Sequence, residues 1–134
     1  MIDEPTRPVP GTGLRRLVDA LRYSGLGLRH ALRHETAIRQ ELLLMALLTP
    51  VSLCLHVGRL EHLLLILSML LVVLVEFLNS AVESAVDRIS TDPHPLSGQA
   101  KDLGSAAVLI ALIMWALTWG VIAGPLALGL LRGR

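Results

Sequence analysis

The sequence predicts an all-α membrane protein that crosses the bilayer three times. Hydrophobic residues make up 53% of the 134 positions and charged residues 17%, with a mean hydropathy of +0.63, whereas a soluble domain carries about a quarter charged residues. Charge is almost missing from residues 42–58, 62–82 and 103–131, where Glu76 is the one exception. Because a helix needs roughly 20 apolar residues to cross the hydrocarbon layer, these stretches exclude a soluble enzyme, a secreted disulfide scaffold and a disordered tail.

The whole chain, 1–134, is expected to form a single membrane domain. Residues 1–12 contain three prolines and no apolar core of a signal peptide, so they predict a short disordered lead-in. Residues 14–34 place six aliphatic side chains on one stripe of a helix and five arginines on the remainder, which predicts an amphipathic helix lying in the membrane surface. Membrane helices are expected at about 36–57, 60–90 and 101–131.

The distribution of positive charge predicts the orientation. Nine of the 12 Lys and Arg residues precede the first span or lie between the second and third spans, and three lie elsewhere. The positive-inside rule therefore places the N-terminus and the 84–102 loop in the cytoplasm. The net charge of +1 leaves no basic patch outside the membrane flanks, and no nucleic-acid partner is expected. Cys54 is alone in the first span and is interpreted as a small core residue.

One face of the second span carries polar groups that a membrane helix does not normally tolerate. A carboxylate at the bilayer centre costs about 2.5–3.5 kcal/mol on insertion scales, so this face must contact protein, water or a cation. Its members fall within about 100° of arc on a helix; they are Glu76, Asn79, Ser80, Glu83 and Asp87.

The first and third spans begin with polar groups at the same, cytoplasmic end. Glu35 and Arg39 have the i, i+4 spacing of an ion pair and are followed by Glu41, while Lys101, Asp102 and Ser105 open the third span. Carboxylates that converge with a lysine at a membrane surface indicate a hard cation bound together with phosphate, and Mg²⁺ is an ion that takes such oxygen ligands. A network of ion pairs that joins the three helices is the structural alternative.

The chain resembles the bacterial integral-membrane diacylglycerol kinases in four runs: YSGLGLRHAL (23–32), RHETAIRQE (33–41), EFLNSAVESAVDRI (76–89) and HPLSGQAKDLGSAAVLIA (94–111). The resemblance covers about residues 14–120, and no P-loop or protein-kinase motif accompanies it. It implies a homotrimer in the bacterial inner membrane with active sites shared between neighbouring subunits. The implied reaction moves the γ-phosphoryl group of MgATP to the primary hydroxyl of diacylglycerol and gives phosphatidic acid.

The resemblance also implies roles for individual residues. Glu76 corresponds to the general base, Asn79 to the polar neighbour that orients the site, and Glu35 and Glu83 to the Mg²⁺ ligands. Nucleotide binding is implied for Arg16, Tyr23, Glu35, Glu83, Asp92, His94, Lys101 and Asp102. Binding of the lipid substrate is implied for Ser24, Arg39, Gln40, Glu41, Glu76, Ser105 and Trp119.

Two other functions are consistent with parts of the pattern. An undecaprenol kinase would share the fold and every catalytic residue, although the runs SAVESAVDRI and KDLGSAAV are more similar to the diacylglycerol enzyme. A non-enzymatic proton or cation channel subunit would also place acidic residues inside a membrane helix. Consumption of ATP separates the channel from both kinases.

Overall fold

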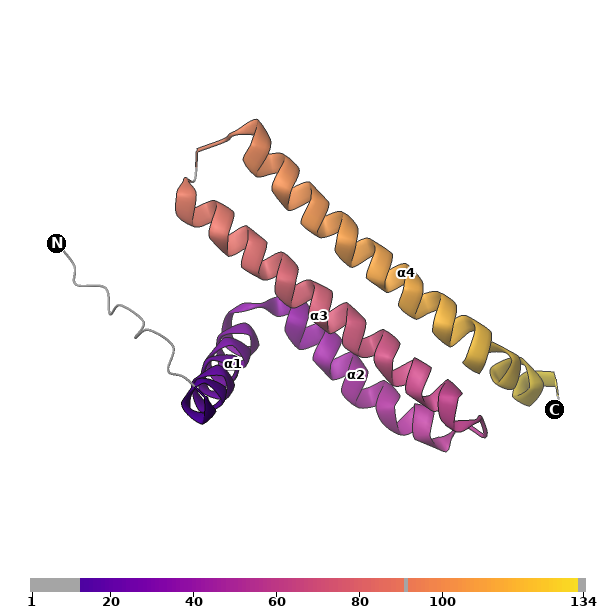
Figure 1. Ribbon diagram of the computed structural model, residues 1–134. Helices are drawn as coiled ribbons and strands as arrows, with labels where there is room; N and C mark the ends of the chain where they lie inside the picture. The colour runs from indigo at the N-terminus through magenta and orange to yellow at the C-terminus, as the bar shows by residue number, and fades with distance from the viewer. Residues whose placement is uncertain (1–12, 91, 133–134) are drawn as a thin grey trace. The chain divides into compact units, whose positions relative to one another are not determined.

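The computed structural model describes residues 13–90 and 92–132, with side chains up to residue 129. The predicted lead-in over 1–12 lies outside this range. Within the described residues the chain is helical, with α1 (Leu14–His34), α2 (Thr36–Cys54), α3 (Arg59–Ile89) and α4 (Pro95–Arg132) (Figure 1). The chain divides into two compact units, one containing α1 and the other containing α2, α3 and α4, and each is described by itself.

α1 covers the residues for which a surface helix is predicted. Gly13 precedes it with a φ of 64°, a conformation that glycine adopts without steric cost, and the carbonyl of Gly13 accepts a 3.1 Å hydrogen bond from the Arg16 N–H. The last turn carries Arg33 and His34, whose positive charge favours a helix C-terminus. The aliphatic stripe is exposed, from Leu14 at 78% to Leu32 at 44%, and its placement in the membrane surface stays a prediction.

α2 and α3 form a helical hairpin around a short turn over residues 55–58. α2 ends at Cys54, three residues before the predicted limit of the span, because Leu55 adopts extended backbone angles and its N–H bonds to the Ser52 carbonyl. α3 begins where Gly58 acts as the N-cap and the Glu61 side chain accepts a hydrogen bond from the Gly58 N–H. This capping satisfies a backbone donor that the first turn leaves free.

α4 begins six residues before the predicted membrane span. Pro95 supplies a first helical residue whose fixed φ suits that position, and the Gly98 N–H donates to the His94 carbonyl at 3.0 Å. From there α4 lies alongside α3 (Figure 1). The Trp119 indole N–H donates to the Leu65 carbonyl at 3.3 Å and joins α4 to α3 near the start of α3.

α3 is the central helix of the second unit and supplies most of its core. Leu65, Met69, Val72 and Val73 are buried there, together with Ile38 of α2, and Ala111 is the one buried residue among the described side chains of α4. α2, α3 and α4 are each long and apolar enough to cross a membrane, which confirms the prediction of three long apolar helices. Helices that are apolar around most of their surface are expected where lipid or other protein surrounds them.

The three helices differ in length, and this difference positions the polar residues. The 19 residues of α2 extend about 28 Å and the 31 residues of α3 about 46 Å. Because the two helices run antiparallel from the turn at 55–58, α3 continues for about 18 Å beyond the start of α2. Asn79, Glu83 and Asp87 lie on this extension, and Glu76 lies near the level of Thr36.

Candidate active site between α2, α3 and α4

Glu76 lies at the centre of a group of four carboxylates. Its side chain belongs to the core of α3 and is only 8% exposed. The charge of Glu76 interacts with those of Glu83, Glu35 and Glu41. The polar residues at the start of α2 therefore meet the polar face of α3, as the predicted spans require.

Asn79 connects this acidic group to α4. Its amide nitrogen donates to Glu83 Oε1 at 3.1 Å, and the residue is 9% exposed. Gly104 of α4 packs directly on it: a Cβ atom at Gly104 would collide with Asn79 Oδ1 and lie 3.3 Å from Asn79 Cγ. A glycine is needed here for the two helices to approach this closely. The sequence pattern gave no role to Gly104.

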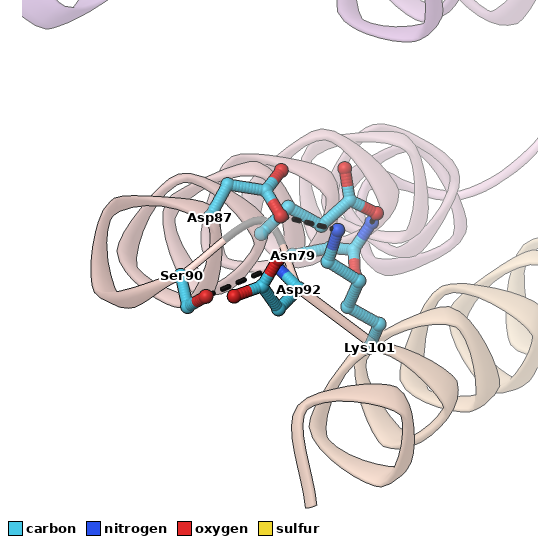
Figure 2. A network of polar contacts seen from close by, with 6 residues as sticks. Asn79, Asp87, Ser90, Asp92 and Lys101 are labelled. Atoms are coloured by element: carbon cyan, nitrogen blue, oxygen red, sulfur yellow. Dashed lines mark hydrogen bonds and ion pairs between the residues drawn. The ribbon is translucent and has the colours of Figure 1, made fainter. Parts of the chain in front are cut away.

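A polar pocket opens where α3 ends and α4 begins. Lys101 Nζ forms a 2.6 Å ion pair with Asp87 Oδ1 across it (Figure 2). The Asp92 N–H donates to Ser90 Oγ at 3.0 Å, and His94 Nδ1 accepts from the Leu96 N–H at 3.2 Å. The pocket has a volume of about 530 Å³ and is lined by Val86, Asp87, Ser90, Asp92, Pro93, His94, Pro95, Ser97, Gly98 and Lys101. Three of the residues for which the resemblance implies nucleotide binding therefore line the same pocket: Asp92, His94 and Lys101.

The ion pair across this pocket is expected to add little to stability. The side chains of Lys101 and Asp87 are 40% and 56% exposed, and exposed pairs are worth about 0.2–1 kcal/mol because water screens them. A double-mutant cycle with Lys101→Met and Asp87→Asn, measured by detergent unfolding, should give a coupling free energy below about 1 kcal/mol. A coupling of several kcal/mol would instead make the pair a structural clamp between α3 and α4.

A second cavity, almost entirely apolar, lies between the three helices. Its volume is about 40 Å³, and its walls are Glu41, Leu44, Met45, Met69, Val72, Val73, Leu112 and Trp115. Glu41 is the one charged residue in this wall, and its Oε2 atom is buried without a hydrogen-bond partner. The sequence pattern is consistent with Trp115 facing lipid, so its place in this wall is a finding of the structure.

The remaining residues implied by the resemblance occupy several places. Arg39 donates to Thr36 Oγ1 at 3.0 Å, and the other three at the starts of α2 and α4 are exposed: Gln40, Asp102 and Ser105. Three belong to the separate α1 unit, namely Arg16, Tyr23 and Ser24. Trp119 lies 18 residues after Lys101, or about 27 Å along α4, so the structure does not bring it to the polar pocket.

The chemistry of the two carboxylates Glu35 and Glu83 fits Mg²⁺ bound together with phosphate. Among residues 13–90 and 92–132, no three His, Cys, Asp or Glu side chains gather closely enough to hold an ion by themselves. Mg²⁺ usually takes one or two carboxylates and completes its shell with phosphate oxygens and water. Glu35 and Glu83, which both lie within electrostatic range of Glu76, can supply two such carboxylates.

Comparison with known proteins identifies the family. Residues 22–123 match the family model of the prokaryotic diacylglycerol kinases. The chain is 49% identical to a diacylglycerol kinase of Haemophilus influenzae over 109 residues, covering 81% of this chain and 92% of that protein. It is 48% identical to the diacylglycerol kinase of Escherichia coli K12, covering 83% and 91%, and 49% identical to that of Pseudomonas aeruginosa, covering 83% and 90%. The chain therefore belongs to the prokaryotic diacylglycerol kinase family and is an enzyme of that family.

Proposed function

We propose that the enzyme transfers the γ-phosphoryl group of ATP to the primary hydroxyl of diacylglycerol and releases phosphatidic acid and ADP. The observation that carries the proposal is the group of four carboxylates that Glu76 forms with Glu35, Glu41 and Glu83, together with a polar pocket lined by Lys101. The relatives' name supports diacylglycerol as the acceptor. Membership of an enzyme family removes the reason to propose a channel subunit.

The reaction requires positioning and charge more than covalent help from the protein. The hydroxyl oxygen of the lipid forms a bond to the γ-phosphorus, the bond from that phosphorus to the β,γ-bridging oxygen breaks, and ADP leaves with the electron pair. Glu76 accepts the proton of the hydroxyl as general base. Lys101, at the polar pocket, supplies positive charge to the phosphates.

Mg²⁺ is the proposed cofactor, held by Glu35 and Glu83. When bound, it offsets the negative charge of the β- and γ-phosphate oxygens. The hydrogen bond from Asn79 to Glu83 Oε1 supports this assignment, because it fixes one carboxylate oxygen and leaves the other for the ion.

The nucleotide is proposed to bind in the polar pocket. Asp92, His94 and Lys101 line it, Asp102 follows Lys101 on α4, and Arg16 and Tyr23 are the proposed contributions of α1. The lipid is proposed to contact residues at the starts of α2 and α4 and on α1, together with one residue further along α4; these are Ser24, Arg39, Gln40, Glu41, Ser105 and Trp119.

The proposed assembly is a homotrimer in the bacterial inner membrane with active sites shared between neighbouring subunits. The exposed apolar residues of α3 and α4 support it, since this surface requires lipid or other copies of the chain around it. The excess of Lys and Arg before α2 and between α3 and α4 supports a cytoplasmic N-terminus. α1 is proposed to lie in the membrane surface, at the level of the lipid hydroxyl.

Transfer of labelled γ-phosphate in mixed micelles tests the function. The enzyme is given diacylglycerol, undecaprenol or no lipid, each with and without Mg²⁺. We expect Mg²⁺-dependent labelling of diacylglycerol above that of undecaprenol. A preference for undecaprenol would assign the same chemistry to a polyprenol kinase, and no transfer to either lipid from folded protein would overturn the proposal.

A further inference from the structure

Two histidines lie side by side near the C-terminal end of α1. His30 and His34 are four residues apart, so their side chains share one face of the helix. Their ring centroids are 4.6 Å apart, and the ring planes are inclined to each other by 33°. The end of α1 therefore presents two imidazole rings in contact.

The spacing of the rings matches what a single metal ion requires of two histidine ligands. With Zn–N bonds of about 2.0–2.1 Å and angles between about 90° and 109° at the ion, the centroids of two bound imidazoles are about 4.5–5.2 Å apart. The observed distance of 4.6 Å falls within this range. Two histidines four residues apart are also the arrangement by which a helix binds zinc in the HExxH motif. The backbone of α1 therefore already holds the two rings at the separation that a shared ion needs.

The pair is on the side of α1 that faces away from the aliphatic stripe. At 100° per residue, His30 and His34 fall roughly 160° from the centre of that stripe, and both side chains are exposed. The adjacent arginines, Arg29 and Arg33, fall about 80–120° around the helix from the pair. Because the aliphatic stripe is proposed to contact the membrane, the two imidazoles are accessible to ions in the water.

The chemistry of the ligands selects the class of ion. Imidazole nitrogen suits Zn²⁺, Cu²⁺ and Ni²⁺, whereas Mg²⁺ and Ca²⁺ take oxygen ligands. Among residues 13–90 and 92–132, no group of three or more His, Cys, Asp and Glu side chains could hold an ion, so water or an anion must complete the coordination. A site with two protein ligands is open, unlike the closed four-ligand sites of structural zinc, and its ion can exchange.

We propose that His30 and His34 form an exchangeable binding site for a first-row transition-metal ion of the Zn²⁺ class on the water-facing side of α1. The two side chains supply two nitrogen ligands, and water or an anion supplies the others. The bound ion links two successive turns at the end of α1, immediately before Glu35 in the sequence, and stabilises the helix there. The site uses two residues that have no role in the proposed kinase reaction and does not depend on that reaction.

Titration of Zn²⁺ into the full-length protein in detergent micelles tests the site. Excess Mg²⁺ is present throughout to occupy carboxylate sites. We expect one Zn²⁺ ion per chain. Replacement of either histidine by alanine should weaken binding about tenfold or more, since even the outer-shell partners of metal ligands contribute about 10–100-fold to affinity. His56→Ala, which removes a histidine from the turn at 55–58, is the control and should bind as the wild type does. Unchanged Zn²⁺ affinity in His30→Ala and His34→Ala would overturn the proposal.

The spacing of the ligands can be tested in the His34→Ala background. Leu26→His places a new histidine four residues before His30, and Leu28→His places one two residues before it. Both leucines are exposed, at 54% and 46%, so neither change disturbs a core. Residues four apart share a helix face and residues two apart do not, so Leu26→His should restore Zn²⁺ binding and Leu28→His should not. Equal Zn²⁺ affinity in the two variants would show that helical spacing is irrelevant and would contradict the proposal.

Copper provides a spectroscopic readout of the ligands themselves. Cu²⁺ accepts the same imidazole ligands and binds more tightly than Zn²⁺ in the Irving–Williams order. With one Cu²⁺ ion per chain, the electron paramagnetic resonance spectrum of the wild-type protein should show splitting from two nitrogen ligands. The spectrum of His30→Ala should show fewer. Coordination by oxygen alone in the wild-type protein would make the histidine pair a ring contact without a metal role.

Discussion

Replacing Glu76 by glutamine should abolish phosphoryl transfer while the enzyme still binds MgATP. The substitution keeps the size of a side chain that is 8% exposed and removes the carboxylate that is proposed to accept the proton of the lipid hydroxyl. General-base catalysis contributes about 10²–10⁴-fold to rate, so kcat should fall by at least that factor. The nucleotide is proposed to contact Lys101 and the proposed Mg²⁺ ligands Glu35 and Glu83, all of which remain.

The measurement combines kcat for diacylglycerol with a direct binding titration of MgATP. Glu61→Gln is the control: Glu61 is also on α3, but it lies in the first turn and accepts a hydrogen bond from the Gly58 N–H, which an amide oxygen can still accept. This variant should retain wild-type activity. Equal loss of MgATP affinity and turnover in Glu76→Gln would show that Glu76 holds the metal or the fold instead.

Substitution of Gly104 by alanine should raise the Mg²⁺ concentration that the enzyme needs, although glycine has no side chain that could take part in the reaction. The added Cβ would collide with Asn79 Oδ1, and the side chain must move or the two helices must separate. Separation of the helices would keep the 3.1 Å hydrogen bond from Asn79 to Glu83, because both residues are on α3, whereas displacement of the Asn79 side chain breaks this bond and Glu83 loses the contact that orients it. Overpacking of this kind costs about 1–3 kcal/mol, and the Mg²⁺ concentration needed for half-maximal activity should rise about tenfold or more.

Gly120→Ala is the matched control for this variant. Gly120 is on the same helix, and a Cβ atom added there meets no atom within 4 Å, so alanine should be neutral or stabilising by up to about 1 kcal/mol. Detergent unfolding and Mg²⁺ titration of activity should be measured on both variants. If Gly104→Ala has a wild-type Mg²⁺ requirement, Asn79 does not position a metal ligand.

The sequence predicts the helices and the polar face well because both depend on local pattern. The charge-free stretches define three apolar helices, and helical periodicity alone places Glu76, Asn79 and Glu83 on one side of α3. The limits of the helices depend instead on caps. Leu55 ends α2 and Pro95 starts α4 through backbone conformations that a count of apolar residues does not detect.

The contacts between helices could not be predicted in the same way. The pairing of Lys101 with Asp87, the packing of Gly104 on Asn79 and the place of Trp115 in the apolar cavity all depend on the register of α4 against its neighbours. That register depends on packing along the whole pair of helices, α3 and α4. Hydrophobic periodicity does not specify the relative shift of two helices that are apolar around most of their surface.

The short α2 makes the enzyme sensitive to the thickness of the bilayer. Its 19 residues, about 28 Å, nearly match a hydrocarbon layer of about 30 Å. In a thicker bilayer α2 must locally thin the membrane, or else the Glu35 carboxylate is drawn into hydrocarbon. The longer α3 and α4 have no such limit, because their extra turns extend past the start of α2. Under the proposed function, the composition of the membrane that supplies the substrate would therefore also set the depth at which the carboxylates meet the lipid hydroxyl.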